Sequence, residues 1–202
     1  MKISGTHYRT IWLADDRWSV VVIDQTRLPH SFETLALASA ADCARAIAGM
    51  QVRGAPLIGA TAAYGLAMAL RQDASDAHLT ETIALLAKQR PTAVNLRWAL
   101  EEMRQAVVGL PAKERAAAAY VRAARICDDD IETCRRIGGH GLVLLQQLAA
   151  GKKIGEPVNI LTHCNAGWIA CVDWGTATSP IYQAHDAGMN VHVWVDETRP
   201  RN

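Results

Sequence analysis

The sequence predicts a mixed α/β protein in two parts. A small N-terminal β-element with a helical bundle is expected over residues 1–125, and the first part of a Rossmann-like parallel α/β domain over residues 126–202. Three observations support this prediction: β-rich runs within residues 1–38, helical periodicity from residue 39 to about residue 150, and a strand–helix–strand pattern after residue 151.

The N-terminal β-element is predicted from short runs rich in β-branched and aromatic residues. Residues 10–13 and 18–23 are separated by four residues that suit a hairpin connection, and a third run covers residues 31–37. Ser39 and Asp42 then resemble a capping box, and the apolar spacing behind them predicts the first helix.

The helical bundle is predicted from four further stretches. Residues 57–70 are apolar on nearly every side and are expected to form a central buried helix. Pro and Gly bound the next two helices, predicted over residues 80–88 and 92–108. The helical pattern continues over residues 112–150, where a glycine-rich segment (GGHG, residues 138–141) predicts a kink or break.

The C-terminal part is predicted as one βαβ crossover, with apolar strands at residues 158–162 and 191–195 and a helix over residues 175–187. Two parallel strands cannot cover their own faces, because parallel sheets need helices on both sides. We therefore expect this chain to be the first part of a longer polypeptide, or to need another chain that completes the sheet.

Composition excludes several classes of protein. Lys and Arg total 21 against 20 for Asp and Glu, so no bulk charge favours nucleic acid or an anionic membrane. No apolar run reaches the roughly 18 residues of a membrane span, and the N-terminus lacks the apolar core of a signal peptide. We expect a soluble cytoplasmic protein with no nucleic-acid or membrane partner.

No metal site is predicted. The five cysteines include no CxxC pair, and the histidines show no metal spacing on one helix, so most of these side chains are expected to be buried or satisfied.

The strongest candidate for a catalytic segment follows the strand at residues 158–162, because open α/β sheets bind ligands at the carboxyl ends of their strands. Cys164 lies there within the motif THCNAG of residues 162–167, and Gly167 would let the backbone approach a ligand. From this placement alone, a buried strand-end cysteine in a glycine turn is an equally good interpretation.

Two arginines stand just before predicted helices, and helix N-termini bind anions well. Arg53 stands before Gly54 and Ala55, and Arg90 comes directly before Pro91. A guanidinium beside free helix N–H groups can hold a phosphate or a carboxylate, although each arginine taken alone is also explained as a solvent-facing side chain. No P-loop, GxGxxG or GxSxG motif supports another enzyme class.

Taken together, these segments resemble the methylthioribose-1-phosphate isomerase family, which is related to the alpha, beta and delta regulatory subunits of the eukaryotic initiation-factor exchange complex. The resemblance begins at the IDQ of residues 23–25. Four motifs in consistent order carry it: VRGAPLIG at residues 52–59 with AYG at 63–65, RPTAVNL at 90–96, THCNAG at 162–167, and DETRPR at 196–201.

The resemblance implies an aldose–ketose isomerase of methionine salvage, a homodimer without metal or organic cofactor. It would convert 5-methylthioribose 1-phosphate to 5-methylthioribulose 1-phosphate. It further implies that Arg53, Gly54, Ala55 and Arg90 bind the sugar phosphate and that Cys164 is catalytic. Because the 1-phosphate blocks spontaneous ring opening, the enzyme must open the ring by acid catalysis. Hydrogen then moves between C2 and C1 by hydride shift or through an enediol.

The sequence also departs from the family pattern. The family supplies a catalytic aspartate and an Asn-Lys pair after its Glu-Thr-Arg-Pro-Arg motif, and none of these is among the 202 residues. This segment alone is therefore expected to be inactive and to need the C-terminal remainder of the same polypeptide. Residues 167–175 are bulkier than the family's small-residue run, which leaves the C5 substituent of the substrate open.

Two alternatives remain at this point. One is an isomerase of a related pentose phosphate, such as 5-deoxyribose 1-phosphate or ribose 1,5-bisphosphate. The other is a non-catalytic regulatory protein similar to the initiation-factor subunits.

Overall fold

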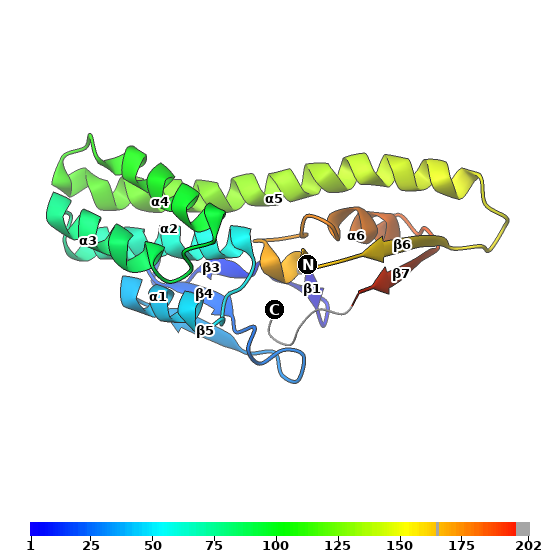
Figure 1. Cartoon of the computed structure of the whole chain (residues 1–202), viewed down its shortest axis with the longest axis horizontal. Helices are drawn as coiled ribbons and strands as arrows, with labels where there is room; N and C mark the ends of the chain where they lie inside the picture. Colours follow the sequence, from blue (N-terminus) through cyan, green and yellow to red (C-terminus); the bar gives the residue numbers. More distant parts are fainter. Residues whose placement is uncertain (165, 197–202) are drawn as a thin grey trace.

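A computed structural model describes residues 1–164 and 166–196. Asn165 and the part of the DETRPR motif after Asp196 lie outside the described residues. The mixed α/β fold is confirmed, with a small β-element and helices followed by a parallel βαβ unit (Figure 1).

The N-terminal β-element is an antiparallel sheet of three strands in the order β3-β4-β5. Its strands are β3 (Ile11–Leu13), β4 (Val20–Ile23) and β5 (Thr34–Leu37), with Trp12 opposite Val21 and Val21 opposite Ala36. The sequence did not predict a separate hairpin of β1 (Lys2–Ile3) and β2 (Thr6–His7), whose strands are only two residues long.

The helical bundle is built around α2 (Ala55–Gln72), which is buried along most of its length as predicted. Around it lie α1 (Ala40–Ala48), α3 (Asp76–Ala87) and α4 (Val94–Val107). The predicted cap of α1 is present, since the Ser39 hydroxyl accepts a hydrogen bond from the Asp42 N–H. Helix α3 begins earlier than predicted, because Ser75 accepts from the His78 N–H and caps an additional turn.

Helix α5 (Ala112–Ala150) continues for 39 residues and extends along both parts of the molecule (Figure 1). The predicted kink or break at residues 138–141 is therefore wrong. The glycines serve helix packing instead: a Cβ at Gly138 would lie 2.2 Å from Ser179 Oγ, and one at Gly141 would lie 2.6 Å from Pro180 Cβ. Glycine lets α6 approach α5 at both positions.

The C-terminal βαβ unit consists of β6 (Val158–Thr162), α6 (Ser179–Asp186) and β7 (Val191–Val195), and its strands are parallel as predicted. Helix α6 begins four residues later than predicted. Trp174 and Gly175 have positive φ angles of 66° and 77°, which no right-handed helix accommodates. Between β6 and α6, Trp168–Ala170 forms a 3₁₀ turn, η1.

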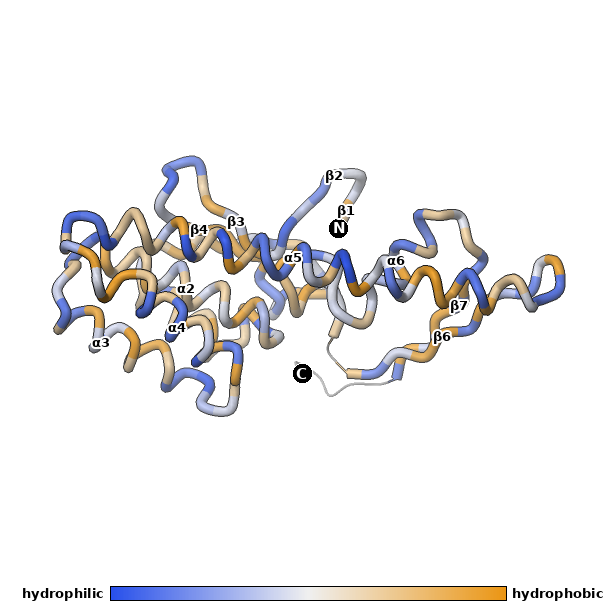
Figure 2. The backbone as a smooth tube through the Cα atoms, turned by 90° about the horizontal axis from the view of Figure 1, so that it is seen from above, coloured by the Kyte–Doolittle hydropathy of each residue, from blue (hydrophilic) through white to orange (hydrophobic). Residues whose placement is uncertain are grey.

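One face of the β6–β7 sheet is only partly covered by other elements. Hydrophobic residues recur along both strands, which lie beyond the end of the helical bundle (Figure 2). Leu161 and Trp194, which are opposite one another on the paired strands, are 67% and 58% exposed. None of the described helices, α5 included, has an apolar stretch long enough for a bilayer crossing.

The predicted domain division at residues 125 and 126 falls inside α5. The N-terminal half of this helix packs on the bundle core, whereas Gly138 and Gly141 in its C-terminal half contact α6. The division stays a prediction.

Candidate functional site

The loop before α2 is held against η1 by a glycine. Gly54 has φ +92° and ψ 138°, a conformation almost restricted to glycine, and a Cβ at this position would lie 2.3 Å from the Cα of Ala170. Ala55, the exposed first residue of α2, follows directly. The segment carrying Arg53 is thus in direct contact with the turn that follows Cys164 in sequence.

Arg53 and Arg90 are near enough for their positive charges to interact. Burial lowers the pKa of the Arg53 guanidinium, and the positive charge of Arg90 lowers it further. Nη1 of Arg90 is buried without a hydrogen-bond partner. Within residues 1–164 and 166–196, no carboxylate lies within 4 Å of either guanidinium. Two interacting cations without such a counter-ion form a site that favours a multiply charged anion.

Helix N-termini reinforce this positive potential. Neither α2 nor α4 has a side-chain cap, so N–H groups of their first turns remain free for a ligand. The two helices approach closely near these ends, since a Cβ at Gly59 would lie 3.0 Å from the Asn95 carbonyl oxygen. The arginine pair and the helix ends together form what we term the anion cradle: Arg53, Gly54, Ala55 and Arg90.

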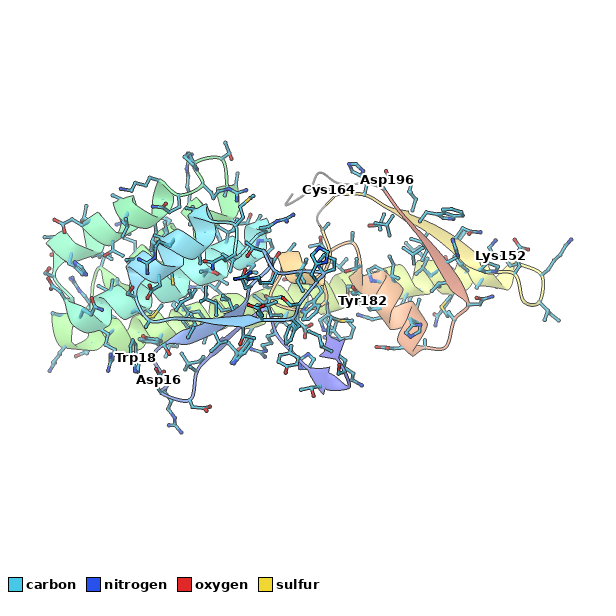
Figure 3. The ribbon with its side chains drawn as sticks, turned by 90° about the horizontal axis from the view of Figure 1, so that it is seen from below. Asp16, Trp18, Lys152, Cys164, Tyr182 and Asp196 are labelled. Carbon is cyan, nitrogen blue, oxygen red and sulfur yellow. The ribbon has the colours of Figure 1, made fainter. Side chains whose placement is uncertain are left out.

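Cys164 lies at the carboxyl end of β6, as predicted, and beside Asp196 at the end of β7 (Figure 3). The side chain is exposed and its φ is +69°, so the interpretation as a buried strand-end cysteine is wrong. The other four cysteines are buried, as expected. Cys164 opens onto a cavity of about 520 Å³, whose other lining residues come from β6, β7, η1 and α6: Thr162, Gly167, Trp168, Ile169, Thr178, Ile181, Tyr182, Val193, Val195 and Asp196.

A histidine–carboxylate pair beside Cys164 was missed by sequence reasoning. His163 Nδ1 lies 3.1 Å from Asp196 Oδ2, and the Asp196 N–H donates to the Thr162 carbonyl at 3.1 Å. These contacts hold the ends of β6 and β7 together. The sequence did contain a signal for this pair: His163 and Asp196 each follow a strand of the predicted parallel pair, and the carboxyl ends of paired parallel strands lie side by side.

The anion cradle and Cys164 are connected through η1. The η1 turn therefore touches both parts of the candidate site: Ala170 packs against Gly54 of the cradle, and Trp168 and Ile169 line the cavity at Cys164, whose lining includes no residue of the cradle.

Away from the candidate site, one cluster of side chains among the described residues has the composition of a metal site. Ligand atoms of Asp130, Cys134 and Cys171 all lie within 4.8 Å of one another. The hydrogen bond with Cys134 and burial raise the pKa of the Cys171 thiol, and burial raises that of the Asp130 carboxyl. Both groups are thereby held toward their neutral forms.

Comparison with known proteins gives consistent results. The Initiation factor 2 subunit family matches residues 51–202. Methylthioribose-1-phosphate isomerase of Methylocella silvestris is 58% identical over 202 residues, which cover all of this chain and 55% of that protein. The chain spans about half the length of the curated relatives it matches.

Solved structures of related proteins share the fold. 5-Methylthioribose 1-phosphate isomerase from Pyrococcus horikoshii superposes with a TM-score of 0.81 and 34% identity, over 96% of this chain and 54% of that one. Translation initiation factor eIF-2B subunit delta from A. fulgidus gives a TM-score of 0.80 and 34% identity, over 97% and 56%.

Proposed function

The chain belongs to the Initiation factor 2 subunit family, and from that premise we propose that it forms the N-terminal half of an aldose–ketose isomerase. The substrate is 5-methylthioribose 1-phosphate and the product 5-methylthioribulose 1-phosphate, which places the enzyme in methionine salvage. The observation that carries this proposal is the anion cradle, which is connected through η1 to an exposed cysteine at the carboxyl ends of two parallel strands.

The cradle suits the phosphate of the substrate. A phosphate dianion placed between Arg53 and Arg90 relieves the repulsion between the two guanidinium groups. It also accepts charge-assisted hydrogen bonds, which are roughly twice as strong as neutral ones. Free N–H groups at the starts of α2 and α4 add donors, and their helix dipoles favour negative charge there.

Cys164 acts on the sugar carbons in this proposal. Its side chain faces the cavity, where a thiol or a thiolate could stabilise the transition state of hydrogen transfer between C2 and C1. Ring opening needs a general acid, which we assign to the C-terminal remainder of the polypeptide. Neither step requires a metal or an organic cofactor.

The cavity favours an apolar C5 substituent. Its lining includes Ile181, Val193 and Val195, and no lysine or arginine among the described residues. The described lining offers no cation to a second phosphate, as in ribose 1,5-bisphosphate, whereas its apolar side chains would contact a methylthio or deoxy carbon. Relative kcat/KM values for the three sugar phosphates test this preference.

The C-terminal remainder has a further role in the proposal. Exposed Leu161 and Trp194 leave the β6–β7 sheet with apolar surface that further strands and helices would bury. We assign this role to the rest of a longer chain, which functions as a cytoplasmic homodimer. Mass spectrometry and light scattering of the purified full-length protein test both statements.

A regulatory, non-catalytic function is the second candidate, favoured by the similarity to the delta subunit structure. The two candidates differ at Cys164, since a regulatory protein needs no exposed cysteine beside an anion cradle. A coupled isomerase assay of the full-length protein decides between them: turnover that requires Cys164 supports the isomerase, and a folded protein without turnover supports the regulatory function.

A further inference from the structure

Gln25 is a buried amide between the two loops of the candidate site. It lies two residues after the end of β4 and is only 4% exposed. Its backbone N–H donates to the Gln51 carbonyl at 3.0 Å, which fixes the main chain beside the segment that leads to Arg53.

The side chain of Gln25 contacts both loops. Nε2 donates to the Ile169 carbonyl in η1 at 2.6 Å and lies 3.5 Å from the Arg53 carbonyl in the anion cradle. One amide nitrogen therefore connects the main chain of the loop that carries the phosphate-binding arginine to the turn that lines the cavity at Cys164.

Gln25 also carries one of the few buried polar atoms without a partner. Among the described residues, four buried side-chain atoms lack a hydrogen-bond partner, and three of them belong to Gln25 (Oε1), Arg90 (Nη1) and Trp168 (Nε1). Buried polar groups are normally paired, and leaving one unpaired is costly. Two of these atoms lie on Gln25 itself and on Trp168 in the η1 turn that Gln25 contacts, so this contact is retained although polar atoms beside it stay unpaired.

We propose that Gln25 is a positioning residue, which holds Arg53 and η1 in the relative placement needed for the phosphate and Cys164 to engage one substrate molecule. This inference rests on the proposed isomerase function. Gln25 acts through the main chain of Arg53 and Ile169, because both of its contacts are to carbonyl oxygens.

Two substitutions in the full-length enzyme test this role. Gln25→Met keeps the length and volume of the side chain but removes the donor. Gln25→Glu replaces the donor with a carboxylate that faces two carbonyl oxygens. We expect kcat/KM for 5-methylthioribose 1-phosphate to fall about 10-fold in Gln25→Met and about 100-fold in Gln25→Glu, since a misplacement of 1 Å can cost that much. Both kcat and KM are expected to change, because both loops shift.

The matched control is Gln183→Glu. Gln183 Nε2 also donates to a backbone carbonyl, that of Arg135 at 2.9 Å, but its contact lies between α5 and α6. Its kcat/KM should equal that of the unmodified enzyme. Assays are run well below the thermal midpoint of every variant, so a purely stabilising role of Gln25 would leave the kinetic constants unchanged. Unchanged kinetics in Gln25→Met and Gln25→Glu would overturn the inference.

A second measurement separates this inference from the proposed function. The alkylation rate of Cys164 by iodoacetamide, followed by peptide mass spectrometry, reports its placement without requiring turnover. If the unmodified full-length protein has no isomerase activity, the proposed function fails. The positioning role then stands if the Gln25 variants alter this rate at least 3-fold while Gln183→Glu does not, and it fails if the rate is the same in all of them.

Discussion

Substitution of Gly54 by alanine tests the contact between the anion cradle and η1. The backbone conformation of Gly54 costs a residue with a Cβ about 1–3 kcal/mol. The new methyl carbon would also lie 2.3 Å from Ala170 Cα and 2.4 Å from its carbonyl oxygen, so one of the two loops must move. Overpacking of this kind typically costs about 1–3 kcal/mol more.

We therefore expect Gly54→Ala to lower the free energy of unfolding by about 4 kcal/mol, near the middle of the summed range. Because the displaced segments carry Arg53 and lead from Cys164, kcat/KM should also fall about 100-fold. Urea denaturation of the full-length enzyme measures the first effect, and initial rates of isomerisation measure the second.

Gly155→Ala is the matched control for backbone strain. Gly155 also has a positive φ, +82°, but no atom lies within 4 Å of a Cβ placed there. It should lose only the strain component, about 1–2 kcal/mol, and retain full activity. Equal loss of stability in the two variants, with unchanged kcat/KM in Gly54→Ala, would refute the argument that this contact aligns the site.

Three further predictions concern the site and α5. Cys164→Ser should abolish turnover but leave substrate affinity nearly unchanged, which isothermal titration calorimetry can measure; normal activity would remove Cys164 from the mechanism. Arg90→Lys should raise KM about 10-fold with little change in kcat, because lysine cannot supply the paired donors of a guanidinium; an unchanged KM would place the phosphate elsewhere. Gly141→Ala should destabilise the protein by about 1–3 kcal/mol through the clash with Pro180, whereas Gly139→Ala, with its nearest atom 3.9 Å away, should be neutral or stabilising in the same denaturation experiment.

Local patterns in the sequence were sufficient to predict most of the fold. The buried helix α2, the capped start of α1 and the parallel pair β6–β7 each follow from hydrophobic periodicity and end signals. The start of α3 was missed although its Ser75 cap is a local signal, whereas the wrongly predicted break in α5 has a tertiary cause. The glycines of residues 138–141 favour a break when the sequence is considered alone, yet two of them, Gly138 and Gly141, are required by the close approach of α6 to α5.

Prediction of the candidate site from the sequence was limited in the same way. Sequence reasoning identified Arg53, Arg90 and Cys164 separately, but it could not show that the two arginines are near enough to interact or that Cys164 is exposed. It also missed the pairing of His163 with Asp196, and it gave Gln25 no role. These relations depend on contacts between segments far apart in the chain, such as the 144-residue separation between Gln25 and Ile169.

The most direct test of the central claim is to follow 5-methylthioribose 1-phosphate by ³¹P nuclear magnetic resonance in the presence of the full-length enzyme. The account predicts that the aldose 1-phosphate signal is replaced by that of the ketose 1-phosphate, and that this conversion is lost in Cys164→Ser. A folded, full-length protein that leaves the substrate unchanged would contradict the account.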